Sequence, residues 1–433
     1  MSTKRQLNLC IGFNTTGYLT YAWPYRTGTK TDIFDLAYYQ QLAHLAHRGR
    51  FDAVFLSDNP ALSVEPKGRP FHTLDPLTLS TAILAQVPDI GAIATVSTTY
   101  NLPYNLARST QSADLLSGGR LGLNVVSTFN PLSAANYSAD PLPPREERYA
   151  RATEFIEVCK GLWNSWDPRR AEVPDDLYWN PETAKSINYK GAYQVVRGPL
   201  NVPRGPQGYP VLAQAGGSDS GIELAARHAE LVYCSMLTRE AAREFGRKIR
   251  DKAADIGRDP ASIRILPGVV PIIADSRDEA LRKHELWSGT GSEDGLLKRF
   301  VAENGLDADT FDPDAVLTPE DFVPKQSRGA SVGMQMGLTD LIKYERVTAR
   351  QAVRRTEYHH RLLLGTAEDI ADGLIDFWQD GSVDGWVVQP PRAPDDIQLF
   401  VNKVVPILQE RGVFRRGYAG DTLRQRFGLP LPA

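Results

Sequence analysis

The chain has 433 residues and a formal net charge of −3, and 42% of its residues are hydrophobic and 23% charged. This is the composition of an ordinary globular protein, and it excludes a disordered or collagen-like chain. Lysines and arginines are scattered along the sequence, so neither a nucleic-acid partner nor an anionic membrane is implied.

The spacing of the cysteines and the apolar content of the N-terminal residues indicate the cellular compartment of the protein and its redox state. No apolar run reaches the about 18 residues that a membrane span requires, and the first residues lack the apolar core of a signal peptide. Cys10, Cys159 and Cys234 lie far apart and form no CxxC pair, a pattern typical of a reducing compartment. Cys10 and Cys234 sit inside apolar runs, where we expect buried, inert thiols. We therefore expect a soluble, cytoplasmic protein.

Short apolar runs alternate along the chain with amphipathic stretches of helical periodicity. The expected strands are 7–13, 51–57, 90–98, 121–127, 210–214, 231–236, 263–273 and 385–389. The expected helices are 33–47, 75–86, 105–116, 145–163, 218–228, 239–256, 367–378 and 397–411. Eight strands that alternate with helices predict an α/β fold, the (β/α)8 TIM barrel. A doubly wound open sheet is the alternative, but its first turn would usually carry GxGxxG, and GFNTTGYLTYAW does not.

Two long segments interrupt the alternation, approximately 128–205 after the fourth strand and 289–362 after the seventh. Loops that follow the strands of such a barrel lie on its C-terminal face, where active sites form. We therefore expect one barrel domain over 1–433, with both insertions beside the active site.

The ends of the expected strands carry amides and hydroxyls. Thr95, Asn124, Gln214 and Gln389 lie at or near four of them. Asp58, which follows the second strand, is either a functional carboxylate or a cap for the next segment. Glycoside hydrolysis would need a second strand-end carboxylate. The polar lining suits hydrogen bonding to a neutral polar heterocycle better than acid–base hydrolysis.

A candidate anion site follows the fifth strand. Gly216-Gly217 would let the backbone approach a ligand, and Ser218 begins a helix whose free amides favour an anion. Arg145 and Tyr149, one helical turn apart, could donate to the same phosphate. The plainer interpretations remain open: Ser218 as a simple N-cap, Arg145 in a surface ion pair and Tyr149 as a packed aromatic.

The histidines form no obvious metal site. His44 and His47 are three residues apart on one helix without a nearby carboxylate or cysteine to complete a ligand set, so a solvated helix face is favoured and no metal is expected. The pair His359-His360 lies in the second interruption, and it is either a surface feature or a contact in a substrate cleft.

Several segments, in order over nearly the whole chain, resemble the bacterial luciferase-like flavin-dependent monooxygenases, and in particular the nitrilotriacetate and dibenzothiophene-sulfone monooxygenase group. They are FDAVFLSDN at 51–59, IATVSTTYNLPYNLAR at 93–108, SGGRLGLNVVST at 117–128, RYARATEFIEV at 148–158, VLAQAGGSDSGIELAARHAE at 211–230, GSVDGWVVQPP at 381–391 and FVNKVVPILQERGVFRRGY at 400–418.

The resemblance implies a barrel that binds reduced FMN (FMNH2) at its C-terminal face. It places Asp58, Thr95 and Asn124 beside the flavin, and Arg145, Tyr149 and Ser218 at its phosphate. It assigns Thr128 as the catalytic hydroxyl that faces the flavin peroxide. The chain departs from many relatives at three of its residues: Arg145 and Tyr18 stand where relatives often have His, and Thr128 where they commonly have Ser.

The implied activity is that of a two-component monooxygenase. Reduced FMN would come from a separate NAD(P)H:flavin reductase, and O2 would form a flavin C4a-peroxide that inserts one oxygen atom into a small organic substrate. A deazaflavin (F420)-dependent oxidoreductase on the same barrel is the alternative. Relatives are often dimers or tetramers, so we expect a homodimer or homotetramer. The expected substrate contacts, each of which could instead be a packing residue, are Phe13, Tyr18, Trp23, Phe55 and Trp386.

Overall fold

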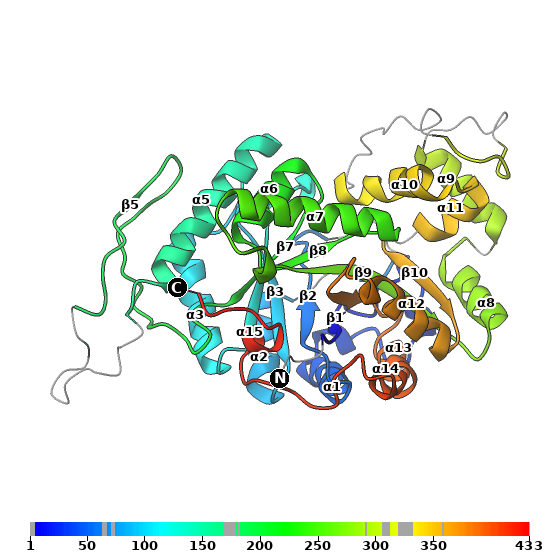
Figure 1. Cartoon of the computed structure of the whole chain (residues 1–433), viewed down its shortest axis with the longest axis horizontal. Helices are drawn as coiled ribbons and strands as arrows, with labels where there is room; N and C mark the ends of the chain where they lie inside the picture. Colours follow the sequence, from blue (N-terminus) through cyan, green and yellow to red (C-terminus); the bar gives the residue numbers. More distant parts are fainter. Residues whose placement is uncertain are drawn as a thin grey trace.

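The apolar runs fold into parallel strands that close into a ring (Figure 1). In the computed structural model, which describes residues 5–62, 67–70, 74–167, 179, 182–290, 292–304, 312–318, 332–356 and 359–432, β8 pairs with β9, β9 with β11, and β11 with β1. The predicted eight-stranded barrel is thus confirmed. Its strands are β1 (Asn8–Gly12), β2 (Ala53–Leu56), β3 (Gly91–Ser97), β4 (Leu121–Val126), β7 (Val211–Ala215), β8 (Leu231–Cys234), β9 (Arg264–Ile273) and β11 (Gly385–Val388).

Helices surround the ring and begin where their capping residues predict. Asp75 accepts a hydrogen bond from the Thr78 amide and Ser218 from the Gly221 amide, so each satisfies a donor at a helix start. The outer helices are α1 (Leu36–Arg48), α2 (Pro76–Gln86), α3 (Pro103–Leu116), α5 (Arg145–Trp163), α6 (Asp219–His228), α7 (Arg239–Asp255) and α12 (Ala367–Gln379). The helix expected over 397–411 is α13 (Asp395–Leu399), a π-helical turn (Phe400–Val404) and α14 (Val405–Glu410).

One strand of the main sheet was not predicted. β10 (Arg361–Gly365) runs parallel to the second half of β9, from Val269 to Ile273, and extends the sheet beyond the eight strands of the ring. Its apolar run is short and follows the His359-His360 pair at the end of the second expected insertion. The sequence pattern therefore did not distinguish this strand from the insertion. β10 matters for the site because it carries His360 to the barrel.

Additional elements follow β4 and β9. After β4 come α4 (Pro131–Ala134) and, beyond α5, the hairpin of β5 (Tyr189–Lys190) and β6 (Val195–Val196), which lies away from the barrel on the left of Figure 1. After β9 come α8 (Arg277–Trp287), α9 (Glu293–Asn304), α10 (Val332–Glu345) and α11 (Ala349–Thr356). Leu296, Phe300, Leu341 and Val353 from three of these helices share a small core with Leu237. The assignment of 1–433 to one domain with insertions at 128–205 and 289–362 remains our proposal.

Side chains that alternate along the strands make two apolar layers. Leu9 and Ile11 of β1 face outward and pack with the helices, whereas Cys10 between them faces the barrel interior. All three cysteines are buried and free, as expected for Cys10 and Cys234. The inner layer also holds Leu423, Phe427 and Leu429 of the C-terminal segment, which begins at α15 (Leu423–Arg426).

Two buried ion pairs tie the C-terminal segment to the strands. Arg424 binds Glu230 at the start of β8, and Glu230 also accepts a hydrogen bond from the Leu212 amide at 3.0 Å. Arg415 donates to Asp52 at 2.5 Å, and Asp52 accepts from the Leu9 amide at 2.8 Å. Both carboxylates are therefore paired and hydrogen-bonded, as buried charges must be.

None of the helices in the described ranges is long and apolar enough to cross a membrane.

We predict that Arg424→Ala lowers the free energy of unfolding by about 3–5 kcal/mol, because Glu230 is left as a buried charge without its partner. Arg227→Ala is the matched control, since Arg227 pairs with Glu223 on the surface of α6 and such pairs contribute about 0.3–0.5 kcal/mol. Urea unfolding followed by circular dichroism gives both values. Equal losses in the two variants would contradict a special role for the buried pair.

Candidate functional site

Near the C-terminal ends of the strands, a layer of polar and aromatic side chains closes the barrel interior. We call this layer the floor of the site. It lies one step above the apolar inner layer, because every second residue of a strand faces inward. Its rings and amides touch across the barrel: the centroids of Phe55 and Tyr233 are 5.1 Å apart, and Gln389 Nε2 donates to the Tyr233 hydroxyl at 2.8 Å. The residues of the floor are Phe55, Thr95, Asn124, Tyr233 and Gln389.

One side of the floor has a buried acceptor without a partner. Asn124 Nδ2 donates to Thr95 Oγ1 at 3.0 Å, whereas Asn124 Oδ1 has no hydrogen-bond partner in the part of the chain that the structure describes. A buried acceptor left unsatisfied costs about 1–3 kcal/mol, so it points to a ligand that donates to it. The structure thus brings Thr95 and Asn124 together, as strand register alone would predict.

Hydroxyl groups continue this side above the floor. Ser97 Oγ and Thr128 Oγ1 are 2.7 Å apart, and the Thr128 amide donates to Thr99 Oγ1 at 3.1 Å. These bonds hold the segment after β3 against the segment after β4. Thr128, the predicted catalytic hydroxyl, therefore stands in a defined position next to the strand that carries Asn124.

The other side of the floor is a chain of hydrogen bonds across four strands. Ser57 Oγ donates to Asn14 Oδ1 at 3.0 Å, and Asn14 Nδ2 donates to Gln389 Oε1 at 2.6 Å. Gln389 Nε2 donates to the Tyr233 hydroxyl, whose oxygen lies 2.6 Å from His360 Nε2. Polar residues at the strand ends were noted from the sequence, but their connection through Tyr233 was not.

Two glycines make room for this chain. A Cβ on Gly12 would lie 2.0 Å from Gln389 Oε1, and a Cβ on Gly268 would lie 2.5 Å from His360 Nδ1. Real Cβ atoms do not approach other atoms so closely, so any larger residue would displace the amide or the imidazole. The histidine therefore lies over β9 and reaches Tyr233 on β8.

His360 is a buried residue of the site, so of the two interpretations of the His359-His360 pair the surface one does not hold for it. The residue is 5% exposed, and burial lowers its pKa to about 3, which keeps the imidazole neutral at ordinary pH. The Tyr18 ring centroid lies 5.4 Å from that of His360, and the Arg69 guanidinium lies over the Tyr18 ring. Tyr18, an expected substrate contact, is thus part of the site.

Asp58 lies at the rim, directly after β2 and Ser57. Burial, and to a smaller extent the negative charge of Asp75, raise its pKa to about 6. Its neighbour Asn59 accepts from Asn130 Nδ2 at 3.0 Å and Ser133 Oγ at 2.6 Å, which ties this rim to α4. A carboxyl group that changes charge near pH 6 at the edge of a cleft is a candidate functional group.

A second pole of the site lies where α5 and α6 pack beside the end of β7. An added Cβ on Gly216 would lie 2.6 Å from Gln214 Nε2 and 3.2 Å from the Tyr149 hydroxyl, so Tyr149 reaches the glycine turn. Ser218 caps α6. Arg145 is the exposed first residue of α5, one turn before Tyr149. The structure therefore brings the helix start, the glycine and the phenol together, as an anion site requires.

Arg148 is a residue that sequence reasoning missed. Its Nη1 donates to the Thr128 carbonyl at 2.5 Å and its Nε to the Pro143 carbonyl at 3.0 Å. It thereby links the segment after β4 to the start of α5, and so the hydroxyl side of the floor to the anion pole. Arginines stand at 145, 148 and 151 on the same helix, and nothing in the sequence distinguishes Arg148 from the other two.

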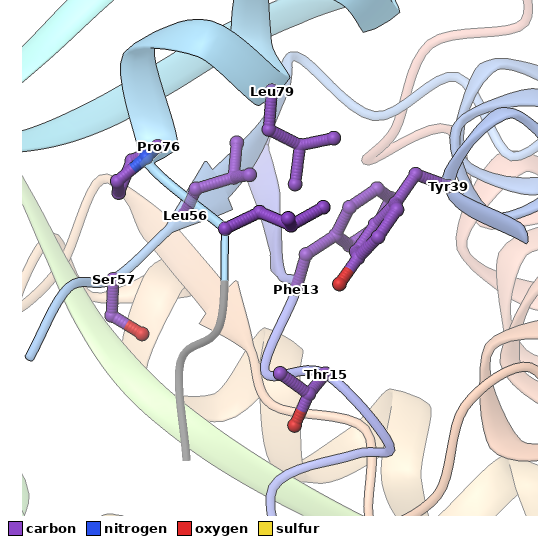
Figure 2. A pocket seen from close by; sticks show the side chains of 8 residues that line it. Phe13, Thr15, Tyr39, Leu56, Ser57, Pro76 and Leu79 are labelled. Atoms are coloured by element: carbon purple, nitrogen blue, oxygen red, sulfur yellow. The ribbon is translucent and has the colours of Figure 1, made fainter. Parts of the chain in front are cut away.

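Two expected substrate contacts do not lie in the floor. Trp386 is fully buried and faces outward, where its ring packs on Phe377 and its Nε1 donates to the Leu374 carbonyl of α12 at 3.0 Å. Phe13 packs in the outer layer, beside Tyr39 and Leu56 in a small hollow shown in Figure 2. Residue alternation places both on the helix side of their strands.

Trp23 lies in a short 3-10 helix (Trp23–Tyr25) after β1. Its Nε1 donates to the Lys67 carbonyl at 3.0 Å, and the Lys30 ammonium lies 5.5 Å from its ring centroid. These contacts hold two surface segments together. Of the five expected substrate residues, Phe55 and Tyr18 are the ones that the structure connects to the floor and to His360.

The described residues contain no group of three or more His, Cys, Asp or Glu side chains that could hold a metal ion.

Comparisons with known proteins agree on one family. The sequence profile described as luciferase-like monooxygenase matches residues 17–385. N-acetyl-S-(2-succino)cysteine monooxygenase of Bacillus subtilis (strain 168) is 37% identical over 100% of this chain and 98% of its own length. Nitrilotriacetate monooxygenase component A of Aminobacter aminovorans is 36% identical over the same shares of the two chains.

Solved structures show the same relationship. The EDTA monooxygenase from Chelativorans sp. BNC1 has a TM-score of 0.86 and 41% identity, over 98% of this chain and 99% of that one. A riboflavin lyase, solved with modified FMN and riboflavin, has a TM-score of 0.81 and 27% identity, over 99% and 97%. An F420-dependent secondary alcohol dehydrogenase has a TM-score of 0.58 at 13% identity, so that likeness shows the fold alone.

Proposed function

The chain belongs to the luciferase-like monooxygenase family, and from this premise we propose that it is a two-component monooxygenase that uses reduced FMN and O2 to transfer one oxygen atom to a small organic substrate. The observation that carries the choice of cofactor is the buried, unpartnered Oδ1 of Asn124 in the floor, an acceptor suited to an N–H or O–H group of a flavin.

The residues present fit FMN at both of its ends. Thr95 and Asn124 would contact the ring system or its ribityl chain, and Asp58 would lie at its edge. Gly216 provides a turn without a side chain, beside which the Tyr149 hydroxyl, the start of α6 at Ser218 and Arg145 would hold the phosphate. The bound flavin supplies the reaction with O2.

The protein contributes orientation and exclusion of water. Phe55 and Tyr18 present rings to the space above the floor, where a small substrate would pack. We assign the catalytic position to Thr128, whose hydroxyl is held by Ser97 and would donate a hydrogen bond to the reacting oxygen. α4, which Asn130 and Ser133 tie to Asn59 at the rim, would help to keep water from the reacting oxygen.

The reduced flavin would come from a separate NAD(P)H:flavin reductase. The chain lacks the GxGxxG turn of a dinucleotide-binding unit, and a relative at 36% identity is named as component A. We propose a homodimer or homotetramer as the assembled form.

The experiment that tests the proposed function couples the purified chain to an NAD(P)H:flavin reductase. FMN, O2 and a panel of aminopolycarboxylates, thioethers and sulfones are supplied, and products are identified by mass spectrometry. We expect one class to gain one oxygen atom, or to be dealkylated, with incorporation of label from 18O2. Catalase and a reaction without the chain control for free hydrogen peroxide. No labelled product, together with no binding of reduced FMN, would refute the proposal.

We predict that Tyr149→Phe and Ser218→Ala each weaken the binding of reduced FMN about tenfold or more, because each removes a hydrogen-bond donor to a charged phosphate. Asp58→Ala should weaken it as well. Anaerobic titration followed by fluorescence quenching gives the dissociation constants. Tyr189→Phe is the matched control, since that hydroxyl donates to Glu157 beside the hairpin. Unchanged affinity in all three site variants would reject the residue assignment.

We also predict a pH dependence from Asp58. Its pKa of about 6 means that the carboxylate form dominates above pH 6 and the neutral acid below it. The carboxylate is the stronger acceptor, so kcat/KM should fall as the pH drops through 6.

The assignment of this pH limb is tested with two variants. The limb should vanish in Asp58→Asn, and it should move to lower pH in Asp75→Asn, because the charge of Asp75 helps to raise the pKa of Asp58. A limb that survives Asp58→Asn would belong instead to the FMN phosphate, whose second pKa is also about 6.

A further inference from the structure

The segment 128–143 lies between β4 and α5, and it begins with Thr128, the proposed catalytic hydroxyl. It carries α4, which is tied to Asn59 at the rim of the site. The Thr128 amide is held from the side of β3, because it donates to Thr99 Oγ1 at 3.1 Å. The way in which the two ends of this segment are fixed therefore decides where the hydroxyl stands.

The hydrogen bonds around Thr128 leave its hydroxyl able to donate to a ligand. Ser97 Oγ accepts from the Thr99 amide at 3.1 Å, and it lies 2.7 Å from Thr128 Oγ1. Ser97 can therefore donate its own hydrogen to Thr128. In the part of the chain that the structure describes, the Thr128 hydroxyl has no hydrogen-bond partner other than Ser97.

One guanidinium holds both ends of the segment 128–143. Arg148 Nη1 donates to the Thr128 carbonyl at 2.5 Å, and Arg148 Nε donates to the Pro143 carbonyl at 3.0 Å. A guanidinium is flat and its N–H groups point in fixed directions, so one side chain binds two carbonyls at once. Hydrogen bonds from a charged donor are also among the stronger ones in proteins.

The guanidinium of Arg148 is not used in an ion pair. Arg148 makes none with the residues that the structure describes, whereas Arg151, three residues further along α5, binds Glu147 at 2.6 Å. Pairs of the second kind are typical of charges on a helix surface. Arg148 instead directs its donors to the backbone of the segment 128–143.

Arg148 stands on the same turn of α5 as two residues of the anion pole. Arg145 comes three residues before it and Tyr149 directly after it, and the Tyr149 hydroxyl reaches the turn at Gly216. The backbone hydrogen bonds of a helix fix the spacing of these side chains. The turn that would bind the phosphate is therefore also the support from which Thr128 is held.

We propose that Arg148 is a positioning residue, which holds the backbone of Thr128 so that its hydroxyl faces the reacting oxygen. The inference rests on the proposed function and adds the residue that sets the catalytic hydroxyl. A hydrogen bond to the reacting oxygen holds that oxygen at the flavin. Its loss should speed the side reaction in which reduced FMN passes two electrons and two hydrogens to O2, giving oxidised FMN and H2O2.

The test is a double-mutant cycle that needs no substrate. Each chain is saturated with reduced FMN without air and mixed with O2, and the returning absorbance of oxidised flavin gives the rate. We expect Thr128→Val and Arg148→Ala each to raise this rate about three- to tenfold, as for the loss of one hydrogen bond. In the Thr128→Val chain, Arg148→Ala should change the rate by less than about 1.5-fold, because a residue that acts through Thr128 then has no hydroxyl to position.

Two more variants separate positioning from charge. Arg148→Lys keeps the charge but not the fork of donors, so its rate should lie between those of Arg148→Ala and wild type, and it replaces Arg148→Ala in the cycle if that variant does not fold. Arg151→Ala removes a cation from the same helix and should react at the wild-type rate. Arg148→Ala should bind reduced FMN within about threefold of wild type, because it keeps the phosphate contacts.

Hydrogen exchange of the chain without cofactor, followed by mass spectrometry, tests the contact itself. The amides of Thr128 and of Ala134 in α4 are hydrogen-bonded, at 3.1 and 3.0 Å. Arg148→Ala should make peptides from 128–137 exchange faster, whereas peptides from β4 should keep their wild-type rate. Arg151→Ala should leave both sets unchanged.

Several results would overturn the proposal: additive effects in the cycle, a wild-type rate in Arg148→Ala or Arg148→Lys, or unchanged exchange in 128–137. Loss of FMN affinity in Arg148→Ala as large as in Tyr149→Phe would make Arg148 a phosphate ligand and overturn it as well. A wild-type chain that binds no reduced FMN would refute the proposed function and this inference with it. Failure of the inference alone leaves that binding intact, so the two failures are distinguishable.

Discussion

The site depends on one constraint, the alternation of side chains along strands that close into a ring. Residues that face inward can contact only one another. Within each strand, an earlier inward residue joins the apolar layer around Cys10 and Ala53, and the inward residue two positions later joins the floor. A parallel ring aligns all strand ends at the same face, so Thr95 and Asn124 become neighbours without any further device. The chemistry of the floor is therefore decided by which residue types stand at the same height in different strands.

The opposite end of the barrel is closed by the chain itself. Leu423, Phe427 and Leu429 fill the interior from below, and the ion pairs Asp52–Arg415 and Glu230–Arg424 hold the segment in place. Both of these ion pairs are buried. This end is thus organised for stability, and it leaves the ligand-binding role to the face where the strands end. The separation matches the general division of function and stability between the two faces of such barrels.

The sequence predicted what local pattern and order determine, and it missed what depends on contact between distant segments. The eight strands of the ring and the helix start at Ser218 follow from periodicity and from the type of capping residue. Trp386 and Phe13 were expected as substrate contacts with packing as the alternative, and the structure places both in the helix layer, because a shift of one residue along a strand moves a side chain to the other face. β10 pairs with residues of β9 that stand 92 positions earlier, and Arg148 donates to the Thr128 carbonyl 20 positions earlier, so no short window of sequence contains both members of these contacts.

The two faces also differ in how completely their polar groups are satisfied. Asp52 and Glu230 each have an ion-pair partner and a backbone donor, whereas Asn124 Oδ1 and His360 Nδ1 have no hydrogen-bond partner in the described chain. The first is an amide acceptor, and the second is a nitrogen of a ring that lies over Gly268. Each open group costs about 1–3 kcal/mol, and a ligand that satisfies it recovers that free energy only in the folded state. The acceptor beside Thr95 is the group that the proposed flavin would satisfy, so binding of the cofactor would stabilise this side of the floor.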